Sequence, residues 1–210
     1  MRKITALLML VFAIAFFNAC ESKKETPQPG ETAKPQAEPP EYETGRLAFQ
    51  KMFISARGFA PDIQPFRLQS SYTKDAPVAE GKEGIWHASF ASASKRQLKA
   101  YTWSGVSGPD MPDRGVSHGT EDDYNPSNSS TRVFDMQFLK IDSDKAIKVA
   151  NEHGGAALLK KDPKQPVNFL LDWNGKNQLV WHVIYGESRN TASLIVDVDA
   201  SSGLYVGKGE

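Results

Sequence analysis

Two stretches of the chain carry apolar residues at the spacing of a helix that is buried on one side. In residues 44–59, TGRLAFQKMFISARGF, the apolar positions that follow this spacing are Phe49, Met52, Phe53 and Ala56. In residues 142–155, DSDKAIKVANEHGG, they are Ala146, Ile147, Val149 and Ala150. Recurrence at intervals of three and four residues places such side chains on one face of a helix. Asp142 or Ser143 suits the N-cap of the second helix, so the pattern predicts one helix in each half of the chain.

Each predicted helix is followed by three runs of strand-forming residues. After the first helix these are residues 65–72, 85–90 and 98–105, and after the second they are 166–173, 180–185 and 193–203. The middle run of each set carries the same dipeptide, Trp86-His87 and Trp181-His182. Short runs rich in β-branched and aromatic residues, bounded by turn formers, are typical of β-strands.

Matching positions in the two sets keep a nearly constant separation. It is 98 residues between Ala48 and Ala146, 95 between the two tryptophans, and 98 between Gly105 and Gly203. The same order at a nearly fixed offset indicates an internal repeat. The sequence therefore predicts an α+β fold with two repeated units, residues 41–106 and 133–210, each a helix packed on an antiparallel β-sheet.

The turn between the first two strands of the second unit decides which side chains share a face. Asn174-Gly175 between two apolar runs is a strong hairpin signal. A two-residue loop would pair Asn168 with Trp181 and scatter the apolar residues over both faces. A three-residue loop with a left-handed Gly175 pairs Phe169 with Leu179 instead. Because a one-residue change of register exchanges the two faces, the three-residue loop is favoured.

Between the two units lies a segment without hydrophobic periodicity. Residues 107–132 are rich in turn formers and hold five acidic and two basic side chains. A stretch of this kind is typical of a linker or a functional loop. We therefore expect an acidic loop between the repeats.

The start of the chain has the pattern of a secretory leader. Arg2 and Lys3 precede an apolar stretch from Ile4 to Phe17, which is too short to span a bilayer as a stable helix. The stretch ends Phe17-Asn18-Ala19-Cys20, and Cys20 is the single cysteine of the chain. This ending resembles the lipobox of bacterial lipoproteins. The alternative is an ordinary signal peptide followed by an incidental cysteine.

The lipobox resemblance implies that residues 1–19 are a lipoprotein signal peptide and that Cys20 is acylated, for example with palmitate. Five of the residues 21–40 are proline and none is large and apolar, so residues 20–40 are predicted to be an acylated cysteine and a disordered tether. The implied location is the bacterial cell envelope, facing the periplasm. Glu21 after the cysteine favours the outer membrane over the inner one.

Composition narrows the classes of function. The 210 residues carry 25 basic and 25 acidic side chains, which gives a formal net charge of zero. A nucleic-acid surface built on bulk positive charge is therefore not expected. A single cysteine supplies neither an internal disulfide nor a cysteine-rich metal site.

The second unit resembles a PepSY-type domain. The resemblance lies in AIKVANEHGG (146–155), LVWHVIY (179–185) and IVDVDASSGLYV (195–206), and the first unit matches more loosely. It implies a helix on an antiparallel sheet, and a role in binding or restraining a partner. The family has no catalytic residues to carry over, so tandem PepSY-like domains imply a non-enzymatic protein.

The two repeated dipeptides supply the candidate binding residues. His87 and His182 follow the tryptophans, so as strand residues they point to the opposite face of the sheet. We expect them on an exposed face. A possible binding face is assigned to both histidines and three aromatic residues: His87, His182, Trp86, Trp181 and Tyr185. Aromatic side chains dominate the energetics of many interfaces.

The acidic loop carries residues that could bind calcium or catalyse hydrolysis. Its oxygen ligands, Asp110, Asp113, Glu121, Asp122 and Asp123 with His118, lack the spacing of a calcium loop. Ser117, His118 and Asp122 would make a hydrolytic triad on paper, but no supporting motif surrounds them. We therefore predict no catalytic residues, no metal and no cofactor.

These observations lead to one main functional expectation. The chain is expected to be a lipid-anchored envelope protein that binds a protein or peptide, with a protease-restraining or assembly role as examples. Its partners are expected to be the membrane, through Cys20, and an envelope protein, but not nucleic acid. The alternatives are a carrier of a small apolar ligand in a cavity between helix and sheet, and an enzyme that uses the 107–131 loop.

Overall fold

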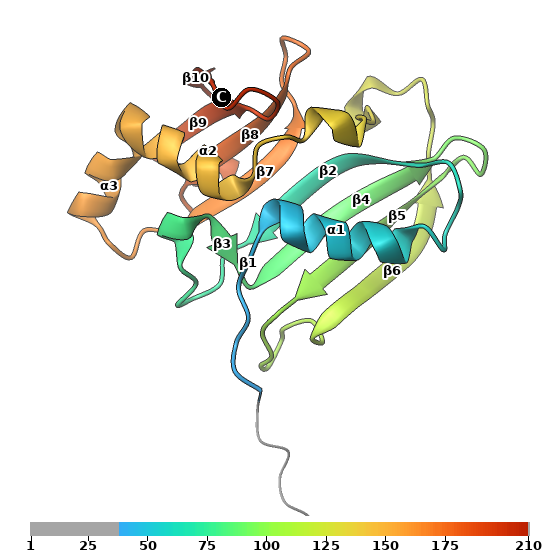
Figure 1. Ribbon diagram of the computed structural model, residues 1–210, viewed down its shortest axis with the longest axis horizontal. Helices are drawn as coiled ribbons and strands as arrows, with labels where there is room; N and C mark the ends of the chain where they lie inside the picture. The colour runs from blue at the N-terminus through green and yellow to red at the C-terminus, as the bar shows by residue number, and fades with distance from the viewer. Residues whose placement is uncertain (1–37, 210) are drawn as a thin grey trace, which may run out of the picture. The chain divides into compact units, whose positions relative to one another are not determined.

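The computed structural model describes residues 38–209 of the chain (Figure 1). The predicted leader, Cys20 and the tether up to residue 37 lie outside the described residues. Residues 38–209 contain three α-helices, α1 (Gly45–Ala56), α2 (Ser143–Ala150) and α3 (Ala156–Lys161). A π-type turn, Asn151–Gly155, joins α2 to α3. Among residues 38–209 no helix is long and apolar enough to cross a membrane.

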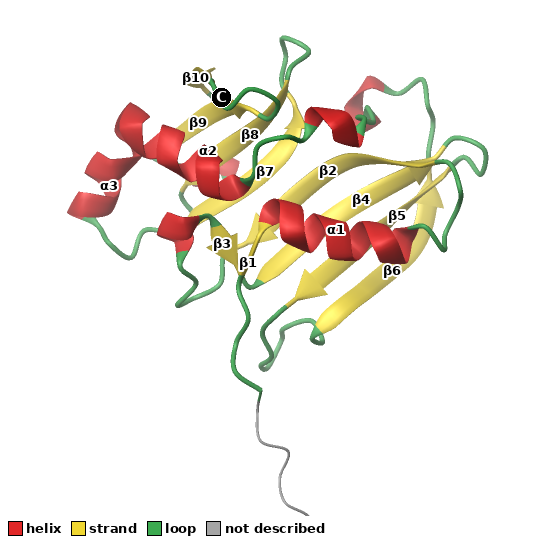
Figure 2. Cartoon of the chain, in the orientation of Figure 1, coloured by secondary structure: helices red, strands yellow, loops and turns green. Residues whose placement is uncertain are grey.

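Eight strands form one antiparallel sheet in the order β10-β9-β8-β7-β2-β4-β5-β6 (Figure 2). Their bounds are β2 Ile63–Ser71, β4 Ile85–Ser92, β5 Gln97–Ser104, β6 Gly115–Asp123, β7 Val167–Trp173, β8 Leu179–Tyr185, β9 Leu194–Asp199 and β10 Tyr205–Lys208. The short strands β1 (Glu43–Thr44) and β3 (Lys82–Glu83) pair with each other. The predicted α+β class is confirmed, and the six predicted strands are present. They join in a single sheet because β2 pairs with β7.

One apolar core lies between the sheet and the helices. Phe49 and Met52 of α1, and Ala146 and Ile147 of α2, are fully buried against it. At its centre Trp86 of β4 meets Trp181 of β8 edge to face, with ring centroids 6.3 Å apart. The predicted helical spacing therefore identified the buried faces of both helices.

The N-termini of α1 and α2 meet above this tryptophan pair and share one carboxylate. Asp142 Oδ1 accepts hydrogen bonds from the backbone N–H of Ser143, at 2.7 Å, and from that of Arg46, at 2.8 Å. Its Oδ2 accepts the hydroxyl of Thr44 at 2.7 Å. Free N–H groups in the first turn of a helix are commonly satisfied in this way. One predicted N-cap thus serves two helices.

The segment predicted as a loop, residues 107–132, is partly a strand. Gly115–Asp123 forms β6 and pairs with β5, with one shift of register. Every one of its nine residues is exposed, so the strand lacks the buried alternating positions that would reveal it in the sequence. The loop prediction was wrong for these residues.

The last part of the predicted tether lies against the folded unit. Arg114 donates from Nη1 to the carbonyl oxygens of Glu38, at 3.3 Å, and Pro39, at 2.8 Å. The backbone N–H of Glu41 binds the carbonyl of Gly105 at 2.8 Å. Residues 38–41 are therefore held against the loop that follows β5.

The register predicted for the β7–β8 hairpin was wrong, although the faces were right. Phe169 pairs with Val183 and Leu171 with Trp181, which leaves residues 174–178 in the loop. The left-handed residue is Asn177, with φ of 62°. Asn174 Oδ1 accepts the backbone N–H groups of residues 176 and 178, at 2.9 and 3.0 Å. This side chain stabilises a wider loop and shifts the register by an even number of residues, which keeps each side chain on its face.

Replacement of Asp142 by alanine should lower the free energy of unfolding by about 2 kcal/mol, because one cap is worth about 0.5–2 kcal/mol and two helices lose theirs. Asp135→Ala is the matched control, since Asp135 caps only the short turn Met136–Phe138. Denaturant unfolding of both variants measures the difference. Equal losses would contradict a shared cap.

Candidate functional site

Three of the five predicted binding residues lie in the core. Trp86, Trp181 and Tyr185 are fully buried between sheet and helices. Trp86 donates from Nε1 to the carbonyl of Glu43 at 3.0 Å, and Trp181 to that of Ile141 at 2.9 Å. Because no partner can reach these rings in the folded chain, their assignment to a binding face was wrong.

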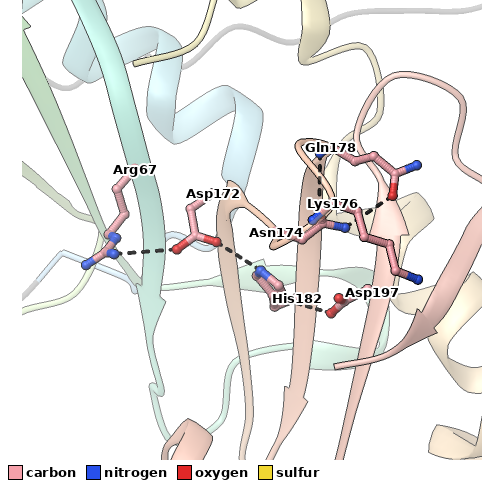
Figure 3. A network of polar contacts seen from close by, with 7 residues as sticks. All are labelled: Arg67, Asp172, Asn174, Lys176, Gln178, His182 and Asp197. Carbon is pink, nitrogen blue, oxygen red and sulfur yellow. Dashed lines mark hydrogen bonds and ion pairs between the residues drawn. The ribbon is translucent and has the colours of Figure 1, made fainter. Parts of the chain in front are cut away.

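His182 lies on the opposite face of the sheet, as predicted, but it is not exposed. Only 2% of the residue is accessible. Its Nε2 is 2.9 Å from Asp172 Oδ1, and its Nδ1 is 2.6 Å from Asp197 Oδ1. Arg67 of β2 reaches Asp172 Oδ2 at 3.5 Å. Figure 3 shows the resulting row of charges, which runs from β2 across β7 and β8 to β9.

This geometry favours a protonated ring. A neutral imidazole donates from one nitrogen only, whereas both nitrogens of His182 face carboxylate oxygens. Burial opposes the charge, but the hydrogen bonds to Asp172 and Asp197 outweigh it and raise the pKa of His182 above its ordinary 6.5. His182 therefore bridges two carboxylates, a setting that favours its protonated form.

His87 occupies the matching place in the other half of the sheet with different partners. Its Nε2 is 3.0 Å from Ser71 Oγ, and its Nδ1 is 2.9 Å from Thr102 Oγ1. Thr102 lies opposite His87 on the next strand, just as Asp197 lies opposite His182. Hydroxyl groups satisfy a neutral ring, and burial lowers the pKa of His87.

The sheet face around His182 is partly covered. Leu170, Ile184 and Ile195 form a second, smaller apolar cluster there, and Ala192 of the β8–β9 loop packs on it. Near the chain end, the Gly209 N–H binds the carbonyl of Ile195 at 3.0 Å. The expectation of an exposed pair of histidines was therefore wrong for His182, while His87 is half-buried.

Sequence reasoning missed the partners that define this network. Asp172 and Asp197 lie in strands, and the only signal was their period relative to His182, because each falls on the same face. Arg67 comes from a strand more than a hundred residues away in the chain. Arg67 is close to Asp172 because β2 pairs with β7, and no local sequence pattern predicts that pairing.

The residues considered for hydrolysis do not form a catalytic group. Ser117 and His118 are neighbours in β6, so their side chains point to opposite faces of the sheet. His118 packs on the ring of Tyr101, with centroids 5.8 Å apart. Within residues 38–209 no group of three His, Cys, Asp or Glu side chains is arranged to hold a metal ion.

β6 is one of the two edge strands of the sheet. This strand ends the sheet on one side, pairs only with β5 there, and has all nine residues exposed. Its pairing is interrupted opposite Ala100, where the register shifts between Lys99 and Tyr101. An edge strand presents unpaired N–H and C=O groups to any extended chain that lies beside it.

A buried carboxyl group lies below the loop that follows β2. Glu83 is fully buried, its Oε2 accepts the backbone N–H of Thr73 at 3.0 Å, and its Oε1 has no hydrogen-bond partner. Burial raises the pKa of Glu83 to about 8. Burial therefore favours the uncharged form of this carboxyl group, which holds the backbone N–H of Thr73.

Comparisons with known proteins give no relative from which the role of this site could be inferred. No family model matches the chain, and searches of curated proteins and of solved structures find no significant match.

The two histidines should titrate on opposite sides of the ordinary value. In an NMR titration of the imidazole resonances, His182 should change charge above pH 6.5 and His87 below it. Equal pKa values for the two histidines, or a lower pKa for His182 than for His87, would contradict the protonated form favoured for His182 and the neutral form favoured for His87.

The same shift predicts a pH-dependent contribution to stability. Because the pKa of His182 is raised on folding, its contribution is complete below the unfolded value of about 6.5 and is lost as the pH rises through the folded value. The destabilisation caused by His182→Gln should therefore be largest just below pH 6.5 and shrink above it.

Proposed function

We propose that the chain is a lipid-anchored lipoprotein of the bacterial cell envelope whose folded part binds a protein or peptide without catalysis. Residues 38–209 would stand away from the membrane on the tether that begins at Cys20. The observation that carries the binding role is the free edge of β6, with nine exposed residues at the end of an eight-stranded sheet.

The proposed binding mode is strand addition. An extended segment of the partner would pair with β6 through backbone hydrogen bonds, and side chains along β6 would select the segment. The neighbouring strands are all antiparallel, so an antiparallel segment continues the sheet with the same geometry. The interruption opposite Ala100 limits the regular stretch to one part of the edge.

We further propose that the two halves are repeated PepSY-like units. The order of the strands is symmetric about the centre of the sheet. Counting outward from the centre, β2 corresponds to β7, β4 to β8, β5 to β9 and β6 to β10. In both halves the indole N–H binds the carbonyl two residues before the helix begins, Glu43 and Ile141. In both halves the following histidine bonds to the two adjacent strands. Such agreement in detail supports duplication of one unit.

The alternative function, a carrier of a small apolar ligand between helix and sheet, is not favoured, because core side chains fill that layer. The side chains of Phe49, Met52, Trp86 and Phe169 occupy the layer between α1 and the sheet and are almost completely buried. A small-molecule site outside this layer is a separate question.

Photo-crosslinking in the native envelope tests the strand-addition proposal. A photoreactive residue replaces Val116 or Thr120 of β6 in turn, and Ala157, an exposed residue of α3, is the matched control. Adducts with one envelope protein should form from β6 and not from α3. Equal adducts from Ala157, or none from β6, would contradict the proposal, and an adduct of twice the chain's mass would replace the envelope partner by a second copy.

Removal of the acylation site tests the anchor. The Cys20→Ser variant should leave the membrane fraction and appear in the soluble fraction, because the acyl chains supply the membrane affinity. A Ser22→Ala variant, with Cys20 intact, should stay with the membrane. Unchanged membrane retention of Cys20→Ser would refute the lipoprotein assignment.

A further inference from the structure

A cleft of about 520 Å³ opens on the surface between the two halves of the chain, away from β6. One wall is the segment after β2, residues 72–79, and the other is formed by Leu159 of α3 and residues 163–165 that follow it. This volume lies within the range of small-molecule sites, about 300–1,000 Å³. It is too small for a folded partner.

If the two halves are repeats, as proposed above, each wall is formed by a segment that has no counterpart in the other half. The first half runs from α1 to β2 through residues 57–62 without another helix, whereas the second half inserts α3 before β7. The β7–β8 hairpin loop spans residues 174–178, whereas residues 72–84 separate β2 from β4. The two insertions meet at this cleft, although nothing in the shared fold requires either.

The wall formed by α3 is held in place by the turn after α2. Gly154 has φ of 118°, a conformation that favours glycine, and it redirects the chain into α3. A side chain at Gly155 would collide with the ring of Tyr185. The hydroxyl of Tyr185 donates to Asn151 Oδ1 at 2.8 Å. The direction of α3 is therefore fixed by close packing.

The opposite wall is fixed by hydrogen bonds. Glu83 holds the N–H of Thr73, and the N–H groups of Ala76 and Val78 bind the carbonyls of Thr73 and Ala76, at 3.1 and 2.8 Å. Both walls are thus formed before any ligand arrives, which reduces the ordering cost of binding.

The chemistry of the cleft combines apolar walls with basic side chains. Tyr72, which is 43% exposed, and Val78 face it from one side, and Leu159 and Pro163 from the other. Lys74 belongs to the first wall and Lys164 to the second, while Asp75 is the one acidic side chain of the lining. The net charge of the lining is therefore +1. The stems of lysines pack along apolar surface while their ammonium groups stay in water.

We propose that this cleft binds an acidic amphiphile, a single acyl chain with an anionic head group such as a fatty acid. The chain would lie between Tyr72 and Leu159, and the head group would pair with Lys74 and Lys164 at the mouth. The site is separate from β6, so the strand-addition proposal and this one succeed or fail independently.

Calorimetric titration of the full chain carrying Cys20→Ser, with no acyl group of its own, tests the proposal. Dodecanoate is the probe, and dodecanol and dodecylammonium, with the same chain and a neutral or cationic head, are the controls. Dodecanoate should bind one site at least about tenfold more tightly than either control. Equal affinity for dodecanol would overturn the role of the lysines, and no saturable binding of dodecanoate would overturn the site.

Variants place the ligand. Lys74→Gln with Lys164→Gln should weaken dodecanoate binding about tenfold, since each exposed ion pair contributes up to about 1 kcal/mol. Lys145→Gln with Lys176→Gln, two exposed lysines elsewhere, should leave it unchanged. Ala79→Trp should fill the cleft and abolish binding. Full binding by Ala79→Trp, with NMR methyl signals of Leu159 and Val78 unmoved by dodecanoate, would overturn the proposed location.

Discussion

The contact between Trp86 and Trp181 is the constraint on which the rest of the structure depends. Their rings meet edge to face with centroids 6.3 Å apart, one from each half of the sheet, below the point where α1 and α2 begin. Gly45 lies directly above: a Cβ there would come within 2.6 Å of Trp181 and 2.9 Å of Trp86. The helices approach closely enough to share Asp142 only because the first residue of α1 has no side chain. The packing of the core, the capping of both helices and the contact between the two halves therefore all depend on the packing around Gly45, Trp86 and Trp181.

The two halves share this framework but carry different chemistry on the other face of the sheet. Where His87 contacts hydroxyl groups, His182 contacts two carboxylates, and the Arg67–Asp172 ion pair extends the network across the β2–β7 seam. That seam has only two paired positions in register, so side-chain contacts supplement a short backbone pairing. The apolar cluster of Leu170, Ile184 and Ile195 belongs to the second half and is covered. The free edge at β6 and the cleft beside α3 are two surfaces of residues 38–209 that are open to partners.

Hydrophobic periodicity predicted the helices and strands that have a buried face, and it missed a strand that has none. The apolar spacing of both helices and six strands was sufficient because each has a face in the core. β6 was missed since GVSHGTEDD buries none of its nine residues. The Trp-His dipeptides correctly separated two faces, but the aromatic face proved to be the core, because the helices cover it. The hairpin register depended on the Asn174 side chain, and the double role of Asp142 depended on a helix 96 residues away, so neither could be obtained from local sequence.

The substitution Gly45→Ala tests whether the packing of Gly45 on Trp86 and Trp181 holds the two halves together. In a helix this change ordinarily stabilises a protein by up to about 1 kcal/mol, whereas overpacking against two tryptophans should destabilise it by about 2 kcal/mol. Native-state hydrogen exchange, read at amides of β5 in the first half and β9 in the second, measures the effect on each half. Both sets of amides should lose protection by the same free energy, because the tryptophan contact joins the two halves. Unchanged or increased protection, or a loss confined to β5, would contradict it.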